Sequence, residues 1–194
     1  MEGSGLLSDD VRDILVTDDG EAWIATDKGV CSTFDGQGWH PFLDGAEDAD
    51  NSIIALTRDS EGRIWAGTSG AIKRLDGNTW LAFSFTQSGL QGSLTTMLGA
   101  SSGGIWVGTD KGFAFFDGTN FQVGLGDSIS TTSFIEDIFG NLWRGTDKGL
   151  FMYQDSNTNL FNDKNGLLSS NVCALALDDR GRIWAGTDKG ISMY

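Results

Sequence analysis

The sequence predicts an all-β fold, a β-propeller of five blades built from four-stranded antiparallel sheets, with only three strands in the last blade. The first observation is a repeat, because the stretch 178–190, D-D-R-G-R-I-W-A-G-T-D-K-G, recurs four more times upstream. The second is its period, since the repeated tryptophans are 42, 41, 37 and 41 residues apart, at Trp23, Trp65, Trp106, Trp143 and Trp184. A period of about 40 residues with several short β-prone runs in each unit is typical of propeller blades.

The first repeat contains the four strands that one blade needs. Runs of β-forming residues span 11–16, 21–26, 30–34 and 38–42, and turn residues separate them. The dipeptide Asp35-Gly36 between the third and fourth runs favours a tight hairpin. Pro41 lacks a backbone N–H, so we expect it on an edge strand, and the fourth strand is the outer edge of a blade.

The repeats predict a single propeller domain over residues 1–194, with blades at approximately 8–43, 51–84, 92–124, 129–162 and 169–194. Aligning 8–11 with 169–172 leaves no N-terminal strand to complete the last blade. Five blades lie within the range of about four to eight that propellers use. We therefore expect a closed five-bladed ring and a monomer, with 191–194 as a short exposed edge.

The W-x-G-T stretch of each repeat predicts how neighbouring blades pack. Residues two positions apart in a strand share a face, so each tryptophan shares its face with a small residue, at Ala25, Gly67, Gly108, Gly145 and Gly186. We expect the tryptophans to be core residues that cover these gaps, rather than to stack on a ligand. Replacing any of them by alanine should cost about 3–5 kcal/mol.

One residue departs from this pattern. Arg144 stands where the other repeats have an apolar residue, at Ile24, Ala66, Val107 and Ala185. A guanidinium between blades is costly unless it is paired. Glu136 in the preceding strand is the predicted partner, and a role at the channel or with a ligand is the alternative.

Composition argues against several classes of partner. The chain has 27 acidic and 13 basic residues and a formal net charge of -14, which repels a nucleic-acid backbone and an anionic membrane. The N-terminal residues have no basic region followed by an apolar one, and no apolar run approaches the length of a membrane span. We expect a soluble chain without a signal peptide, with no nucleic-acid partner and no membrane insertion.

Residues that could carry chemistry are sparse. Cys31 and Cys173 lie in different repeats without metal-site spacing, and we interpret both as small packing residues. His40 is the only histidine, and we expect it on the surface of an outer strand rather than as a catalytic base. The sequence has no nucleophile elbow, zinc-protease motif, dinucleotide fingerprint or phosphate loop. No catalytic residue and no cofactor is therefore predicted.

One dense acidic cluster lies between the first and second blades, at Asp44, Glu47, Asp48 and Asp50. Carboxylate oxygens are ligands that Ca²⁺ prefers, which makes these residues weak candidates for a calcium site. Their spacing matches no EF-hand loop, so the favoured interpretation is a solvated acidic loop.

Two further acidic motifs recur in the repeats, and we interpret both as turn chemistry. An Asp-Lys doublet follows the second strand, at Asp27-Lys28, Asp110-Lys111, Asp147-Lys148 and Asp188-Lys189. Turns of the D-x-x-G type follow the first strand, and we place their aspartates at Asp18, Asp59, Asp137 and Asp178.

The combined pattern resembles a known repeat. G-L-L-S-x-x-V followed by D-x-x-G-x-I-W-x-G-T-D-K-G is most complete at 5–29 and 166–191, and it resembles the two-component regulator propeller repeat. The resemblance covers essentially the whole chain and implies a β-propeller with a sensing or binding role. It also implies a bacterial protein, in a periplasmic sensor region or in the cytoplasm. It supplies no catalytic residues.

We expect a ligand site at the mouth of the central channel, where loops entering the inner strands meet loops joining second and third strands. The residues just before the inner strands would form a small polar ring, at Asp10, Ser52, Ser93, Ser130 and Asn171. The predicted function is a non-catalytic binding or sensor module for a small polar ligand or glycan, or for a protein partner. The alternative is a metal-dependent propeller enzyme, such as a lactonase, lyase or hydrolase, that uses an acidic channel.

Overall fold

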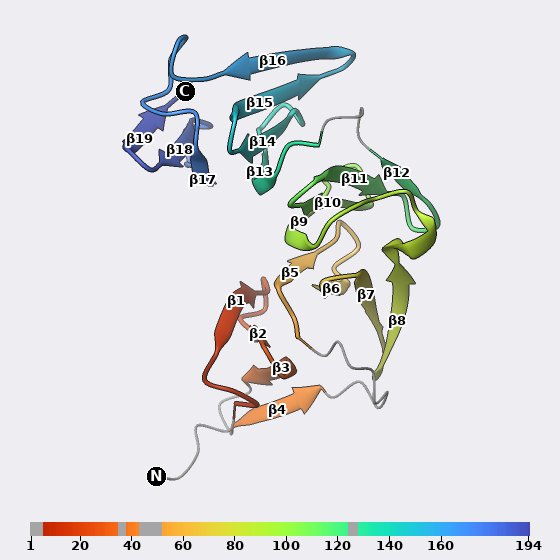
Figure 1. The fold of residues 1–194 in the computed structure, drawn as a ribbon. Coiled ribbons are helices and arrows are strands. Elements are labelled where there is room, and N and C mark those ends of the chain that lie inside the picture. The colour runs from red at the N-terminus through yellow and green to blue at the C-terminus, as the bar shows by residue number, and fades with distance from the viewer. Residues whose placement is uncertain (1–5, 35–37, 43–51, 124–127) are drawn as a thin grey trace.

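The computed structural model describes residues 6–34, 38–42, 52–123 and 128–194. Its five antiparallel sheets follow one another along an arc, and each sheet runs from an inner first strand to an outer last strand (Figure 1). The inner strands contact one another in the order β1, β5, β9, β13 and β17. The predicted propeller of five blades, with three strands in the last, is confirmed.

The strands of each blade pair in chain order, so each blade is a simple antiparallel meander. The first blade contains β1 (Val11–Val16), β2 (Ala22–Thr26), β3 (Gly29–Phe34) and β4 (Trp39–Phe42). The second contains β5 (Ala55–Arg58), β6 (Ile64–Gly67), β7 (Ala71–Asp76) and β8 (Thr79–Ser84), followed by a short 3₁₀ helix, η1 (Phe85–Gln87).

The remaining blades follow the same order. The third contains β9 (Leu94–Gly99), β10 (Ile105–Thr109), β11 (Gly112–Phe116) and β12 (Phe121–Val123). The fourth contains β13 (Thr131–Glu136), β14 (Leu142–Thr146), β15 (Gly149–Gln154) and β16 (Asn157–Phe161). The fifth contains β17 (Val172–Leu177), β18 (Ile183–Thr187) and β19 (Gly190–Met193). Pro41 and the exposed His40 lie on β4, the outer edge strand, as expected for both.

Neighbouring blades pack through one repeated contact. A side chain at the start of each inner strand, here called the knob residue, lies over the small residue of the preceding W-x-G-T strand, here called the gap residue. The four knob and gap pairs are Ile53 with Ala25, Leu94 with Gly67, Thr131 with Gly108, and Val172 with Gly145. A Cβ added at any of these glycines would lie 2.2 to 2.9 Å from its knob side chain, so the gaps are filled.

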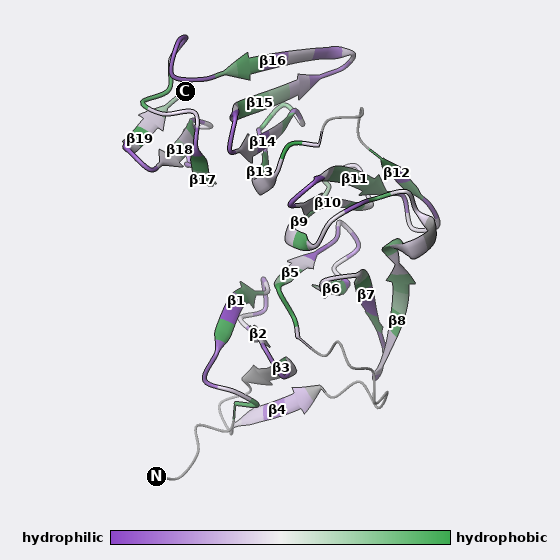
Figure 2. Ribbon diagram, viewed as in Figure 1, coloured by the Kyte–Doolittle hydropathy of each residue, from purple (hydrophilic) through white to green (hydrophobic). Residues whose placement is uncertain are grey.

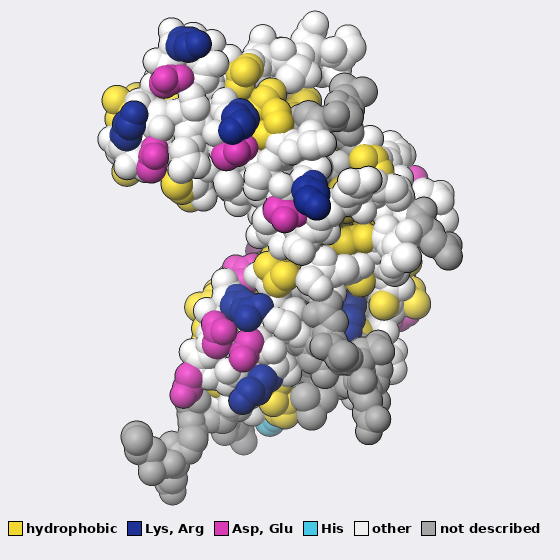
Figure 3. Space-filling view, viewed as in Figure 1, with side chains coloured by type: hydrophobic (Ala, Val, Ile, Leu, Met, Phe, Trp, Pro, Cys, Tyr) yellow, Lys and Arg dark blue, Asp and Glu magenta, His cyan; other side chains and the backbone are white. Residues whose placement is uncertain are grey.

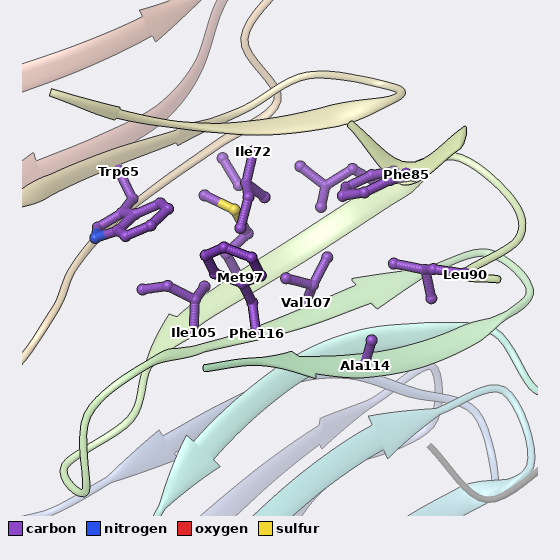
Figure 4. Packing of buried hydrophobic residues seen from close by; sticks show 11 residues of the cluster. Trp65, Ile72, Phe85, Leu90, Met97, Ile105, Val107, Ala114 and Phe116 are labelled. Carbon is purple, nitrogen blue, oxygen red and sulfur yellow. The ribbon is translucent and has the colours of Figure 1, made fainter. Parts of the chain in front are cut away.

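Larger side chains complete each interface around that contact. Between blades two and three, Trp65, Ile72, Met97 and Phe116 are among the residues of the largest buried cluster (Figure 4). The ring centroids of Trp65 and Phe116 are 5.8 Å apart in an edge-on arrangement. The tryptophan of the second repeat is therefore a core residue, as the repeat pattern predicts.

The expected closure of the ring is wrong. Blades one and five lie apart, and the space-filling view shows an open notch between them (Figures 1 and 3). On the face of β1 that points away from blade two, Val11 is 40% and Ile14 59% exposed. Each blade-to-blade contact fixes the rotation between neighbours, and four such steps do not bring the fifth blade back to the first. The expectation of a monomer rested on closure and loses that support.

The D-x-x-G turns are held by their first residue. In blade two, Asp59 Oδ1 accepts hydrogen bonds from the backbone N–H groups of Glu61 and Arg63, and Oδ2 accepts from the side chains of Arg63 and Trp65. Asp137 and Asp178 make the equivalent bonds in blades four and five. These aspartates tie each turn to the tryptophan of its own blade.

In blade one, the predicted turn residue Asp18 is displaced by one position. The backbone bonds that Asp59 makes are made there by Thr17, which accepts from Gly20 N and donates to Glu21 O. Asp18 instead accepts from Arg58 Nη1 of blade two, at 2.5 Å. The spacing explains the shift, because Thr17 lies six residues before Trp23, as Asp59 lies six residues before Trp65, whereas Asp18 lies only five before Trp23.

In blade three Ala100 stands where blade two has Asp59, and a carboxylate from the next blade takes the place of the missing aspartate. Glu136 accepts hydrogen bonds from Ser101 N at 2.8 Å and from Trp106 Nε1 at 3.3 Å. Glu136 is therefore engaged with blade three, and the predicted pairing of Glu136 with Arg144 is wrong. Opposite Arg144 in the register stands Phe134, two residues away from Glu136.

Arg144 is fully buried between blades three and four. Its guanidinium donates to Thr131 Oγ1 at 2.8 Å, to Tyr153 Oη at 3.2 Å and to the carbonyl of Ile129 at 2.5 Å. Its central carbon also lies 4.3 Å from the ring centre of Phe113. The buried charge is thus held by hydrogen-bond acceptors and an aromatic face, which supports the structural role.

Candidate functional site

The predicted rim residues lie beside the Asp-Lys turns of the same blades. In blades one, three and five, the backbone N–H of the turn aspartate donates to the carbonyl of the residue just before the inner strand: Asp27 to Asp10, Asp110 to Ser93 and Asp188 to Asn171. This backbone bond holds the two loops together at one end of these three blades. Because the arc is open, the rim is a crescent and not the predicted ring (Figure 1).

Arg12 joins two of the predicted rim residues. Its Nη1 donates to Ser52 Oγ at 2.6 Å, and its Nη2 lies 3.5 Å from Asp10 Oδ2. Arg12 was missed from the sequence. The signal was available, because it occupies the bulge position of β1 where β9 and β13 have Thr95 and Thr132.

Asp27 adds a carboxylate to the same part of the rim. Its Oδ1 is buried and accepts no hydrogen bond. Buried polar atoms are nearly always satisfied in native proteins, so an unsatisfied acceptor needs an explanation. The backbone N–H of Asp27 donates to the carbonyl of Asp10 at 3.3 Å, so Asp27 lies beside Asp10, and its Oδ1 is an acceptor without a donor among the described residues. Asp10, Arg12, Asp27 and Ser52 are here called the blade-one rim site.

The other predicted rim residues are dispersed along the crescent. Ser93 is exposed, and its N–H donates to Asp110 Oδ1 at 2.8 Å. Asn171 is exposed in the fifth blade, and Ser130 is half-buried in the fourth. The structure therefore brings together only Asp10 and Ser52 among the five.

Charges of both signs alternate along this end of the blades. The lysines of the four Asp-Lys doublets are exposed, and Figure 3 shows basic and acidic side chains side by side at successive blades. In blade four, Lys148 Nζ lies 3.0 Å from Asp147 Oδ2. An alternating surface of this kind offers hydrogen-bond donors and acceptors to a polar ligand without a strong net field.

Metal-binding residues do not gather in the part of the chain that the structure describes. No three His, Cys, Asp or Glu side chains lie close enough together there to hold an ion. The acidic residues Asp44, Glu47, Asp48 and Asp50 lie outside the described residues. Cys173 is exposed rather than packed, which corrects the sequence interpretation, and the side chain of Cys31 lies outside the described part.

A pocket of about 360 Å³ lies away from the rim, between blades three and four. Its lining is largely aromatic, and the rings of Trp106 and Phe115 are tilted by 53° to each other with centroids 4.7 Å apart. Gln122 and Asp155 are its polar side chains. Sequence reasoning missed this pocket, because it depends on contacts between blades that the repeat pattern does not encode.

Comparison with known proteins agrees with the repeat pattern. The family model of the two component regulator propeller matches residues 48–70 and 166–189. The chain carries two-component regulator propeller repeats. No curated protein sequence matches the chain. Among the described residues, no helix has the length and apolar character needed to cross a bilayer.

Solved structures show the same fold at low sequence identity. Virginiamycin B lyase from Staphylococcus aureus has a TM-score of 0.72 at 14% identity, covering 97% of this chain and 71% of the lyase. YCF48 bound to D1 peptide has a TM-score of 0.71 at 15% identity, covering 95% of this chain and 64% of YCF48.

A third structure shows the same fold with a lower TM-score. It is the extracellular domain of a B. thetaiotaomicron protein named as a hybrid two component system, with a TM-score of 0.54 at 21% identity, covering 95% of this chain. The chain spans only 33 to 39% of the length of the three B. thetaiotaomicron extracellular domains that it matches. At these identities, the likeness shows the propeller fold alone.

Proposed function

We propose that the protein is a binding module of the sensor type, and that it holds a small polar ligand of the glycan class at the rim of its inner strands. The observation that carries the proposal is the blade-one rim site, where Arg12 links Asp10 to Ser52, and where Asp27, bonded through its backbone to Asp10, has an Oδ1 without a donor among the described residues. A carboxylate accepts from sugar hydroxyls and a guanidinium donates to sugar oxygens, so the two together suit a polyhydroxylated ligand.

The repeat family supports a sensing role, since its extracellular relatives are named as parts of one- and two-component systems. Likeness in fold to a lyase brings no reaction to this chain, because the fold is shared by proteins of many functions. Binding is therefore the function that the rim supports best.

The test is a screen of the full chain against an array of neutral and acidic oligosaccharides, with hits measured by calorimetry. Asp27→Ala should weaken binding at least tenfold while leaving the melting temperature unchanged or slightly raised, since it removes an unsatisfied buried oxygen. Asp10→Ala combined with Asn171→Ala should leave the melting temperature nearly unchanged and weaken binding as well.

Arg180→Ala is the matched control, because Arg180 is exposed in the D-x-x-G turn of blade five, at the opposite end of the inner strand. It should change neither property. Binding that survives Asp27→Ala but is lost with Gln122→Ala would place the ligand in the aromatic pocket and contradict the proposal.

A further inference from the structure

The two ends of the arc expose the two halves of the contact that joins the blades. At the trailing end, Gly186 is the gap residue of blade five. A Cβ added there would meet only its own blade, with Ala174 O at 3.7 Å, whereas one added at Gly145 would lie 2.9 Å from Val172 Cγ1 of the next blade. The gap over Gly186 is therefore open.

The residue paired with Gly186 is exposed for the same reason. Ile191 stands opposite Gly186 and is 66% exposed. Its counterparts in the other blades, Val30, Ile72, Phe113 and Leu150, are all 7% exposed or less because another blade covers them. The trailing face is defined here as Cys173, Gly186, Ile191 and Met193. It exposes residue types that are buried between blades elsewhere in the protein.

The leading end of the arc carries the matching knob. Val11 stands opposite Thr26 in its blade, as the knob residues Thr131 and Val172 stand opposite Thr146 and Thr187. Both of those knobs are fully buried, but Val11 is 40% exposed. Ile14 and Val16 extend the same apolar face, and Figure 2 shows hydrophobic bands alternating with hydrophilic ones along β1.

A hydrogen bond from the preceding blade accompanies two of the knobs, Thr131 and Val172. Thr95 Oγ1 donates to Thr131 O at 2.6 Å, and Thr132 Oγ1 donates to Val172 O at 2.8 Å, each reaching the knob of the next blade. Cys173 holds that position in blade five, and it is exposed. The site where a following knob would sit is therefore bounded by Cys173 on one side and by the Gly186 gap on the other.

We propose that these faces bind a second copy of this chain, with Val11 of one copy seated on Gly186 of the other. The leading face of blade one carries the knob position and the trailing face of blade five the gap position, so their contact would continue the four interfaces already present. Burial of both apolar faces would drive the association. Since the two faces differ, the contact is head-to-tail and yields either a closed two-chain ring or an open series of chains.

Two variants that each retain one face test this directly. Val11→Asp destroys the leading face and keeps the trailing face, whereas Gly186→Arg fills the gap and keeps the leading face. Each variant alone should remain at the monomer mass of 20.8 kDa in sedimentation or light scattering. Mixed in equal amounts, they should form a one-to-one pair of twice that mass, while the wild-type chain associates on its own as concentration rises.

Phe139→Asp is the control, because Phe139 is 82% exposed in a turn outside both faces, and it should associate like the wild type. Alkylation of Cys173, measured against Cys173→Ser, should slow severalfold in the wild type as concentration rises and stay fast in Val11→Asp. If the two variants fold, by circular dichroism, but their mixture stays at the monomer mass, the proposal is overturned. It is equally overturned by a wild-type chain that stays monomeric at every concentration.

Discussion

Blades four and five have nearly the same central sequence, L-W-R-G-T-D-K-G-L and I-W-A-G-T-D-K-G-I, yet only blade four is buried on both faces. Their strand registers agree, with Gly145 opposite Leu150 and Gly186 opposite Ile191. Leu150 is nevertheless 1% exposed and Ile191 66%. The comparison teaches that each repeat determines its own strands and turns, while burial comes from the next blade, as in quasi-one-dimensional repeat proteins.

Among the substitutions considered, replacing the tryptophan should give the largest difference in unfolding free energy between the two blades. Both indoles donate to the aspartate of their own turn, but Trp143 is 2% exposed and Trp184 is only partly buried. Trp143→Ala should lower the free energy of unfolding by about 3–5 kcal/mol. Trp184→Ala should cost less than half as much in dilute solution, as measured by urea denaturation. Equal losses would mean that the next blade does not determine burial.

Arg144→Ala converts the centre of blade four to that of blade five, which has Ala185 at this position. It removes the hydrogen bonds that Arg144 donates to the carbonyl of Ile129 and to the hydroxyl groups of Thr131 and Tyr153, and it opens a cavity. We expect a loss of about 3 kcal/mol in the free energy of unfolding. A variant that is more stable than the wild type would contradict the structural role of Arg144.

The gap residues give a matched pair of conservative changes. At Gly145 an added Cβ would lie 2.7 Å from Ser133 Oγ and 2.9 Å from Val172 Cγ1, so Gly145→Ala should cost about 1–3 kcal/mol through overpacking. At Gly186 the nearest atom is 3.7 Å away, and Gly186→Ala should be neutral or stabilising by up to about 1 kcal/mol. Thermal unfolding of the two variants side by side checks the difference, and a destabilised Gly186→Ala would show that this gap is already filled.

Much of the architecture could be predicted from the sequence because it is local. A strand of three to six residues, its turn glycine and the residue that opens the turn all lie within one repeat, so periodicity alone located the five blades. The errors arose between repeats. Ring closure depends on the rotation that each interface fixes, and no single repeat encodes that angle.

The site was predicted only in part for the same reason. Three of the residues before the inner strands, Asp10, Ser93 and Asn171, accept a backbone hydrogen bond from the Asp-Lys turn of their own blade, and this contact is internal to one repeat. The link from Arg12 to Ser52 and the contact of Glu136 with Trp106 cross from one blade to another. Such contacts depend on the three-dimensional packing of two repeats, and the pairing of Arg144 with Glu136 was predicted wrongly for that reason.

Replacing the turn aspartates should have the smallest effect on stability. This effect should also depend least on whether a neighbouring blade is present. Burial opposes ionisation of Asp137, but hydrogen bonds from Trp143 and Asn141 outweigh it and hold the pKa of Asp137 below its usual value. Hydrogen bonds from Trp184 and Arg182 likewise hold the pKa of Asp178 well below its usual value. A carboxylate with a depressed pKa adds stability above its unfolded pKa of about 3.9, and that stability is lost as the pH falls below this value.

We therefore expect the free energy of unfolding to fall as the pH drops below about 4, and to fall less steeply in Asp137→Asn and Asp178→Asn. Each variant should reduce the slope by at most about one proton, and Asp178→Asn should have the larger effect, because Arg182 Nε reaches its carboxylate at 2.6 Å whereas blade four has the neutral Asn141. Urea denaturation at several pH values measures both slopes. If only Asp137→Asn changed the dependence of unfolding free energy on pH, the turns would also depend on the next blade. The conclusion that each repeat determines its own turns would then be wrong.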